Sequence, residues 1–176
     1  MSERNSEKWL LERDAIRQFI ALYNANIAAD SPIRLLYQRE RPDAVVEYTR
    51  SRRKLGVEIT HLYYNEYEAK QLLGRAAPGS FGPESFDQLL IELNHRIERK
   101  EAKYASVSLE YPIALLIRNA SPTYGLTEFI ANADRMARSH HIFQSIWLLT
   151  RDGAAQWHLC RLPEEKLPEA EEKRDS

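Results

Sequence analysis

The stretch that decides the fold is residues 42–62, PDAVVEYTRSRRKLGVEITHL. Two runs rich in Val, Ile, Leu, Tyr and Thr, residues 43–49 and 55–62, have the length and composition of β-strands. The basic residues 50–54 between them predict a hairpin turn. Asp43 begins the first strand, and Glu58 follows fifteen residues later in the second. Pairing of the strands would bring both carboxylates together, and such a pair is typical of a site for a hard divalent cation.

The rest of the chain predicts an α/β domain built in layers. Apolar residues recur at helical spacing over residues 7–28, and residues 33–38 have strand character. Further along, the predicted elements are a short helix (65–73), a long helix (83–104), a buried strand (112–119), a third helix (127–139) and a hairpin around Asp152-Gly153 (143–150 and 154–162). Apart from the short helix, the order is helix, three strands, helix, strand, helix and two strands.

Composition limits the class of protein. The chain has 176 residues, 43% of them hydrophobic, and a formal net charge of −1, so it is long enough for one real core and has no overall basic field. We expect one domain over residues 1–162 and a charged, disordered tail over 163–176. A single cysteine, Cys160, excludes an internal disulfide framework. The charged N-terminus and the lack of a long apolar run predict a cytoplasmic protein without a membrane span.

The Pro42-Asp43 pair, the turn, the strand around Glu58 and the surrounding order of elements together resemble the PD-(D/E)XK nuclease superfamily. The resemblance implies the restriction-endonuclease-like fold, an α-β-β-β-α-β core with a mixed central sheet flanked by helices. It also implies a nuclease that hydrolyses phosphodiester bonds in DNA or RNA, with Asp43 and Glu58 holding Mg²⁺ or Mn²⁺. The likeness in topology covers about residues 10–162, whereas the motif covers only residues 42–62.

The chain departs from the superfamily at Thr60, which stands where the pattern has a lysine. That lysine positions the attacking water, and threonine has no charge with which to replace it. One interpretation is that the lysine has moved to the second long helix, as Lys100 or Lys103, which share one helical face. The other is that the site no longer cleaves. Exposure of both lysines to solvent is the plain structural alternative.

The resemblance implies further ligands. The main-chain carbonyl of Ile59 would be a third metal ligand, and Glu12 or Asp14 on the first helix would supply an additional acidic group. Gln88 resembles a glutamine that some branches place near the substrate phosphate. Asp43 as a turn residue after proline, and Glu58 as a solvated strand residue, are the alternatives without a metal.

Two basic groups predict contacts with phosphate: the turn residues Arg50, Arg52, Arg53 and Lys54, and the helix residues Arg96, Arg99, Lys100 and Lys103. The predicted partner is therefore nucleic acid, DNA before RNA, and the chain could form a homodimer. Two other functions compete with the nuclease. One is a catalytically degenerate fold that binds nucleic acid or protein, and the other is an adaptor that docks a partner through an apolar patch around Tyr63, Tyr64 and Tyr67.

Overall fold

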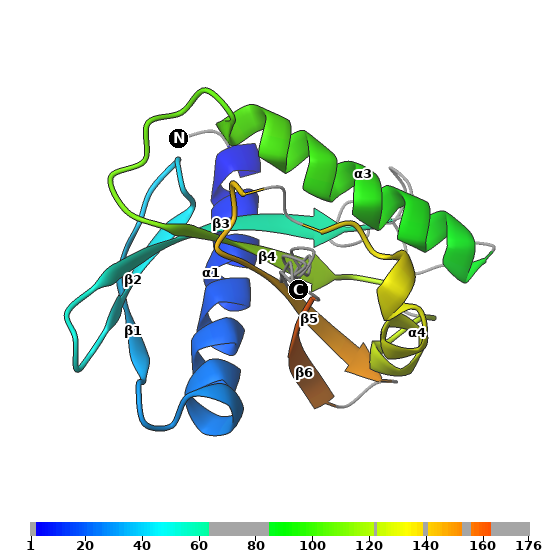
Figure 1. Ribbon diagram of the computed structural model, residues 1–176, viewed down its shortest axis with the longest axis horizontal. Coiled ribbons are helices and arrows are strands. Elements are labelled where there is room, and N and C mark those ends of the chain that lie inside the picture. Colours follow the sequence, from blue (N-terminus) through cyan, green and yellow to red (C-terminus); the bar gives the residue numbers. More distant parts are fainter. Residues whose placement is uncertain (1–2, 64–84, 122, 139–140, 153–155, 163–176) are drawn as a thin grey trace, which may run out of the picture.

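The computed structural model describes residues 3–63, 85–121, 123–138, 141–152 and 156–162, which form one six-stranded sheet flanked by helices (Figure 1). In chain order the elements are α1 (Glu3–Leu22), a π-helical turn (Tyr23–Ile27), β1 (Ile33–Gln38), β2 (Ala44–Tyr48), β3 (Lys54–Leu62), α3 (Phe86–Tyr104), β4 (Ile113–Asn119), α4 (Leu126–Ala131), a 3₁₀ turn (Ala133–Arg135), β5 (Ser145–Asp152) and β6 (Gln156–Arg161).

The sheet is mixed, and its strands lie in the same order as in the sequence, β1-β2-β3-β4-β5-β6. β3, β4 and β5 run parallel, whereas β1-β2, β2-β3 and β5-β6 pair antiparallel. Parallel neighbours need a crossover connection, and α3 and α4 lie in the two crossovers. The α/β class and the mixed sheet that the sequence predicts are therefore confirmed.

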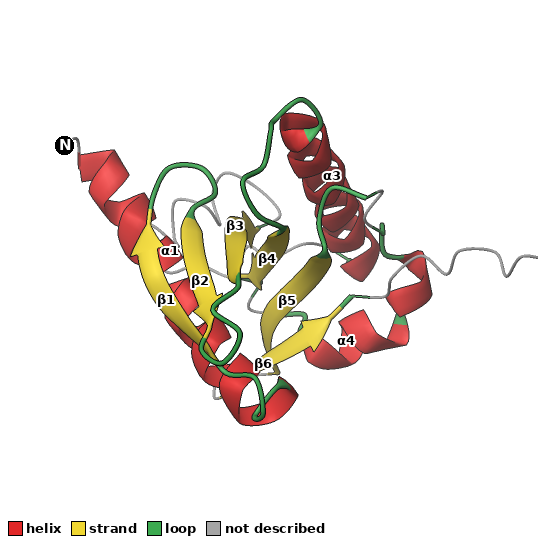
Figure 2. Cartoon of the chain, turned by 60° about the vertical axis from the view of Figure 1, so that its left-hand side comes forward, coloured by secondary structure: helices red, strands yellow, loops and turns green. Residues whose placement is uncertain are grey.

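Two hydrophobic cores cover the two faces of the sheet, with α1 against one face and α3 and α4 against the other (Figure 2). Val57 and Ile59 of β3 belong to the core on the α1 side, and Leu62 belongs to the core on the α3 side. Because side chains alternate along a strand, Glu58 and Thr60 point with Leu62 toward α3. A charged side chain in this central strand is therefore buried.

Most predicted elements are present, with ends that differ by a few residues. The long helix begins at Phe86 rather than at residue 83, because the Ser85 hydroxyl caps it by accepting a hydrogen bond from Gln88 N at 3.4 Å. The third helix was predicted to end at residue 139 but ends at Ala131. The next residue, Asn132, donates a side-chain hydrogen bond to the Glu128 carbonyl at 2.9 Å. The predicted helix 65–73 and the tail 163–176 lie outside the described residues.

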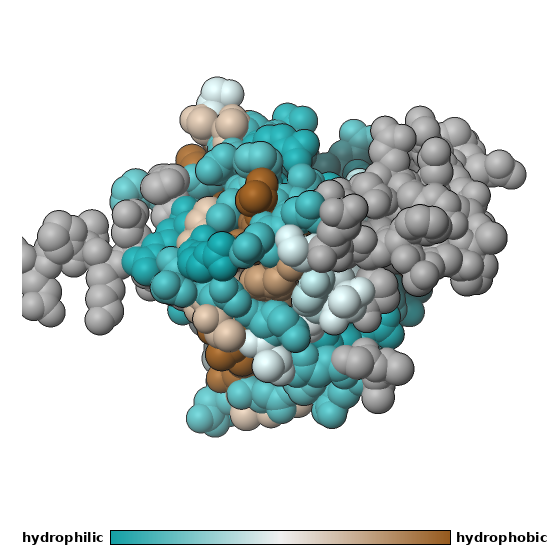
Figure 3. Space-filling view, turned by 90° about the vertical axis from the view of Figure 1, so that its right-hand side faces the viewer, coloured by the Kyte–Doolittle hydropathy of each residue, from teal (hydrophilic) through white to brown (hydrophobic). Residues whose placement is uncertain are grey.

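None of the helices in the described ranges is both long enough and apolar enough to cross a membrane. Figure 3 shows the side of the molecule that carries α4, where the described surface is mostly hydrophilic and its apolar residues form separate small areas. Apart from the adjacent Trp9 and Leu10 of α1, the large hydrophobic residues that are exposed come from different parts of the described chain: Ile27, Tyr37, Ile91, Leu109 and Ile130. Tyr64 and Tyr67, predicted as part of an adaptor patch, lie outside the described residues.

Candidate functional site

The two predicted carboxylates meet where β2 ends beside β3. Ala44 pairs with Val57, which places Asp43 opposite Glu58 at the next step of the ladder. β3 continues past this point without β2 as a partner, so its next main-chain donor needs another acceptor. The Asp43 carboxylate provides it, because Oδ2 accepts a hydrogen bond from the N–H of Ile59 at 2.7 Å. The end of the short strand thus holds Asp43 beside Glu58.

Glu58 is completely buried and is bound by three side chains of α3. Its Oε1 lies 2.6 Å from Nζ of Lys100 and 2.7 Å from Nζ of Lys103, and its Oε2 accepts a hydrogen bond from the Tyr104 hydroxyl. Burial by itself would raise the pKa of Glu58, but the two ammonium groups and the tyrosine outweigh it and hold the pKa below its usual range. Glu58 is therefore ionised.

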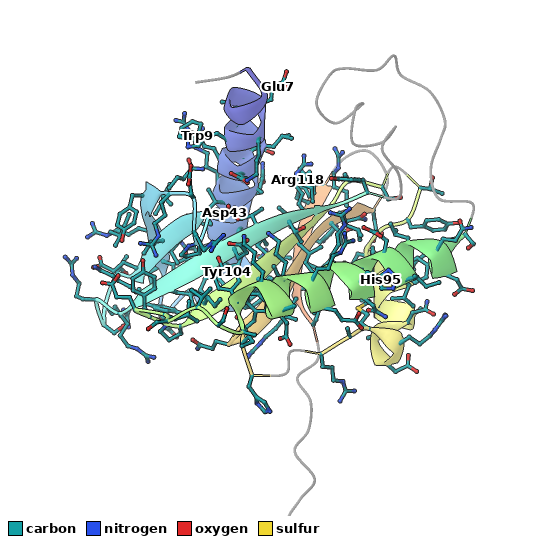
Figure 4. The ribbon with its side chains drawn as sticks, turned by 90° about the horizontal axis from the view of Figure 1, so that it is seen from above. Glu7, Trp9, Asp43, His95, Tyr104 and Arg118 are labelled. Carbon is teal, nitrogen blue, oxygen red and sulfur yellow. The ribbon has the colours of Figure 1, made fainter. Side chains whose placement is uncertain are left out.

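The geometry of α3 explains why these three side chains reach one carboxylate. Lys100, Lys103 and Tyr104 occupy helix positions i, i+3 and i+4, which lie on one face. Ile97, earlier on the same face, is buried in the core and fixes how the helix docks on the sheet. Figure 4 shows Asp43 and Tyr104 near each other, with His95 further along α3 and Arg118 apart from them.

Tyr104 is the site residue that sequence reasoning missed. It continues the apolar stripe of the long helix seven residues after Ile97, and this spacing was the available signal. Burial and the bond to Glu58 raise its pKa, so the hydroxyl keeps its proton and donates a hydrogen bond to the carboxylate.

Asp43 lies in a more negative environment than Glu58. Burial, together with the charges of Glu58 and Glu12, raises its pKa to about 7, and the N–H of Ile59 and the charge of Lys100 offset only part of this effect. Glu12 reaches this region from α1, where it pairs with Lys8 at 3.1 Å. The pKa of Lys8 is raised: burial would lower it, but Glu12, Asp43 and Glu58 outweigh that effect. The charges of Glu12 and Glu58 therefore make the electrostatic potential at Asp43 more negative.

The oxygen atoms at this point fit a divalent cation. Carboxylates of Asp43 and Glu58 and the carbonyl of Ile59 are hard ligands, and Mg²⁺ commonly takes one or two protein carboxylates and fills its other positions with water. Burial and the charges of Glu58 and Glu12 raise the pKa of Asp43, and a cation would offset the part that comes from the two carboxylates. Such a cation would compete with Lys100, which lies 2.6 Å from Glu58 Oε1 and 3.2 Å from the carbonyl oxygen of Ile59.

Glu12 does not complete a three-carboxylate site. Among the described residues, no group of three or more His, Cys, Asp or Glu side chains lies close enough together to hold a metal ion. Glu12 acts on Asp43 through its charge, and its ion pair is with Lys8. Asp14, the alternative acidic residue, instead lies 3.8 Å from Arg118.

The basic hairpin turn does not lie at the carboxylate pair. Lys54 pairs with Glu47, four residues along β2 from Asp43, which amounts to about 13 Å. Arg52 forms an ion pair with Glu47 at 3.2 Å. The turn residues that were predicted to contact phosphate therefore lie at the end of the hairpin opposite the carboxylate pair. They are Arg50, Arg52, Arg53 and Lys54. Gln88 is also remote, since it precedes Lys100 by twelve residues, or about 18 Å of helix.

The second basic group borders the site. Thr60, Arg96, Arg99, Lys100 and Lys103 line a hollow of about 210 Å³, which we call the basic hollow. Glu92 offsets part of its charge through ion pairs with Arg96 at 2.7 Å and with Arg99 at 3.2 Å. The four cationic side chains of the hollow are thus paired with only two carboxylates, those of Glu92 and Glu58. The hollow therefore keeps an excess of positive charge next to Glu58.

A comparison of the chain with known protein families, with curated protein sequences and with solved structures gives no significant match. The function of this chain is therefore inferred from its own residues and their geometry.

Proposed function

We propose that this chain is a metal-dependent nuclease-like protein that hydrolyses phosphodiester bonds. The observation that carries the proposal is the position of Lys100, whose ammonium contacts both Glu58 and the carbonyl of Ile59. Because Thr60 is uncharged, β3 supplies no positive charge to this part of the site. Lys100 of α3 supplies it from the neighbouring layer. The order α1-β1-β2-β3-α3-β4 also supports a restriction-endonuclease-like core.

Each residue of the site would have a distinct role in hydrolysis. Asp43, Glu58 and the Ile59 carbonyl would hold the cation, which supplies Lewis-acid activation of water and of the phosphate. Lys100, already among these oxygens, would donate to the attacking water or to a non-bridging phosphate oxygen as charge develops there. Tyr104 holds one oxygen of Glu58 and so fixes the direction of the other. Lys103 balances the charge of Glu58 by binding its Oε1, whereas Lys100 also binds the carbonyl of Ile59.

One observation favours a second function, a nuclease fold that binds nucleic acid without cleaving it. Glu58 is already bound by two ammonium groups and a hydroxyl, so its charge is balanced without a metal. If those bonds persist when substrate binds, no cation enters. The basic hollow would then serve recognition alone.

The two functions are separated by measuring metal binding and cleavage on the same samples. Calorimetry with Mn²⁺ would be run beside cleavage of plasmid and of labelled DNA and RNA oligonucleotides, using wild type, Asp43→Ala, Glu58→Ala, Lys100→Met and Lys103→Met. Glu98→Ala and Lys54→Met are the matched controls, since both side chains are exposed and lie away from the pair.

For a nuclease, Asp43→Ala and Glu58→Ala abolish metal binding and cleavage, and Lys100→Met lowers the rate by about 10²–10³-fold while Mn²⁺ still binds. Lys103→Met should have a smaller effect than Lys100→Met, and the controls should match wild type. Oligonucleotide binding without metal binding or cleavage would establish the second function. Wild type that neither binds nor cleaves any of these substrates would overturn both.

A further inference from the structure

A second cavity, of about 170 Å³, opens on the other side of Tyr104 from the basic hollow. We call it the arginine pocket, because Arg39 and Arg41 of the β1–β2 connection line it together with Tyr104, Glu110 and Tyr111. Neither arginine was predicted to bind substrate from the sequence. The hydrogen bond from Arg39 N to the main-chain carbonyl of Asp43, at 3.1 Å, holds the connection next to the residue that carries one of the two carboxylates.

The arginine pocket and the basic hollow lie on opposite sides of Glu58 along the same face of β3. Pro42 and Tyr111 of the pocket adjoin Gly56, since a Cβ atom at Gly56 would lie 2.7 Å from Pro42 and 3.4 Å from Tyr111. The hollow begins at Thr60. Gly56, Glu58 and Thr60 alternate onto one face, so the two cavities are about 13 Å apart with Glu58 between them. That distance corresponds to a few nucleotides of a nucleic-acid strand.

The charge of the pocket suits a phosphate. Two guanidinium groups face one carboxylate, that of Glu110, and both arginines are exposed at the surface. The Arg39 guanidinium lies over the Tyr111 ring at 5.5 Å, an arrangement that orients its donors. The positive charge of Arg41 acts on the hydroxyl of Tyr104, which places Arg41 near the tyrosine that binds Glu58. Guanidinium groups bind phosphate oxygens bidentately.

We infer that the arginine pocket binds a backbone phosphate of a nucleic-acid strand on the side of the carboxylate pair opposite the basic hollow. This inference rests on the proposed function. A strand would then cross the α3 side of Glu58 with one phosphate at Arg39 and Arg41, another at the basic hollow, and the intervening phosphodiester at the carboxylates. The β1–β2 connection, rather than the β2–β3 turn, is the basic loop that contacts substrate.

The test is binding of fluorescein-labelled oligonucleotides, measured by anisotropy over a series of salt concentrations, with Ca²⁺ replacing Mg²⁺ to prevent cleavage. Arg39→Gln and Arg41→Gln are compared with Arg50→Gln and Arg53→Gln, which remove the same charge at the far end of the hairpin. A single-stranded DNA, the corresponding RNA and the DNA duplex are the three ligands. Circular dichroism and thermal unfolding of each variant show that the fold is retained.

Arg39→Gln and Arg41→Gln should each weaken binding about three- to tenfold and reduce the salt slope by about one, whereas Arg50→Gln and Arg53→Gln should bind as wild type does. The ligand that shows the largest loss identifies the strand type. If wild type binds and all four variants bind equally well, the arginine pocket is not a phosphate site and the proposed function stands. If wild type binds none of the three ligands, both the pocket and nucleic-acid recognition are refuted.

Discussion

Asp43 and Glu58 are adjacent carboxylates whose charges are balanced very differently. Glu58 has two ammonium groups within 2.7 Å, which help to hold its pKa below the usual range, whereas burial and the charges of Glu58 and Glu12 raise the pKa of Asp43 to about 7. Groups with pKa values driven apart in this way are typical of functional sites. The cause is their location, since α3 delivers its cations to Glu58 and only partly to Asp43.

The raised pKa of Asp43 predicts how stability depends on pH. The folded protein keeps this proton up to about pH 7, whereas the unfolded chain releases it near the ordinary value of 3.8. The stabilisation from protonated Asp43 is therefore complete below pH 3.8 and is lost as pH rises through 7; its upper limit is about 4 kcal/mol. Between pH 5 and pH 8, wild type should lose more of its free energy of unfolding than Asp43→Asn.

Urea unfolding of both proteins at the two pH values measures this difference. Titrating groups that are distant from Asp43 are common to both proteins and cancel in the comparison. An equal change in wild type and Asp43→Asn would mean that Asp43 does not hold its proton near neutral pH in the folded state.

At the scale of elements, the unequal lengths of β2 and β3 create the site. β2 starts at Ala44, whereas β3 runs on to Leu62 beside β4. The part of β3 that β2 does not cover is the part where Asp43, Glu58 and the Ile59 carbonyl come together. Gly56 pairs with Val45 of β2 and with Ile113 of β4, and the Pro42 ring lies over it where a Cβ atom would point, so the connection before β2 packs against the face of β3.

Gly56→Ala should destabilise the protein, because a Cβ atom there would lie 2.7 Å from Cγ of Pro42 and 2.8 Å from Cγ2 of Ile113. Both neighbours are packed side chains, so the strain should lower the free energy of unfolding by about 1–3 kcal/mol. Ser108→Ala, at an exposed residue of the same region, should change it by less than about 0.5 kcal/mol. Denaturant unfolding checks both values, and an unchanged stability for Gly56→Ala would show that Pro42 moves freely away from β3.

At the scale of the whole molecule, one sheet lies between two hydrophobic cores, one on each of its faces. Phe19 of α1 is buried on one side, where it lies 5.9 Å from the Trp147 ring, and Leu93 of α3 is buried on the other. β3, β4 and β5 contribute side chains to both cores. Loss of either core should therefore unfold the sheet that supports the other.

Phe19→Ala and Leu93→Ala should each lower the free energy of unfolding by about 2–5 kcal/mol, and unfolding should remain one cooperative transition. Tryptophan fluorescence, which includes Trp147 on the α1 side, and far-ultraviolet circular dichroism should give the same midpoint in each variant. Ile91→Ala, at an exposed position of α3, is the control. Separate midpoints in Leu93→Ala would show that the two faces unfold independently.

Local patterns in the sequence were enough to predict much of the fold. Strand alternation, helical periodicity and turn residues act over a few neighbours, and they located every strand of the sheet to within a few residues. The same reasoning brought Asp43 to Glu58, because a hairpin leaves little choice of register. It failed at the ends of helices, where the Ser85 and Asn132 caps depend on which of several polar residues binds the main chain.

The sequence by itself determined the order of elements, the buried central strand and the pair of acidic residues, since these follow from spacing along the chain. Only the tertiary structure decided that Lys100 and Lys103 reach Glu58, which precedes them by 42 and 45 residues. It also decided that the β1–β2 connection borders the carboxylates while the β2–β3 turn lies at the far end of the hairpin. These arrangements depend on how α3 docks on the sheet and on which end of a strand a loop leaves, and both are set by packing between layers.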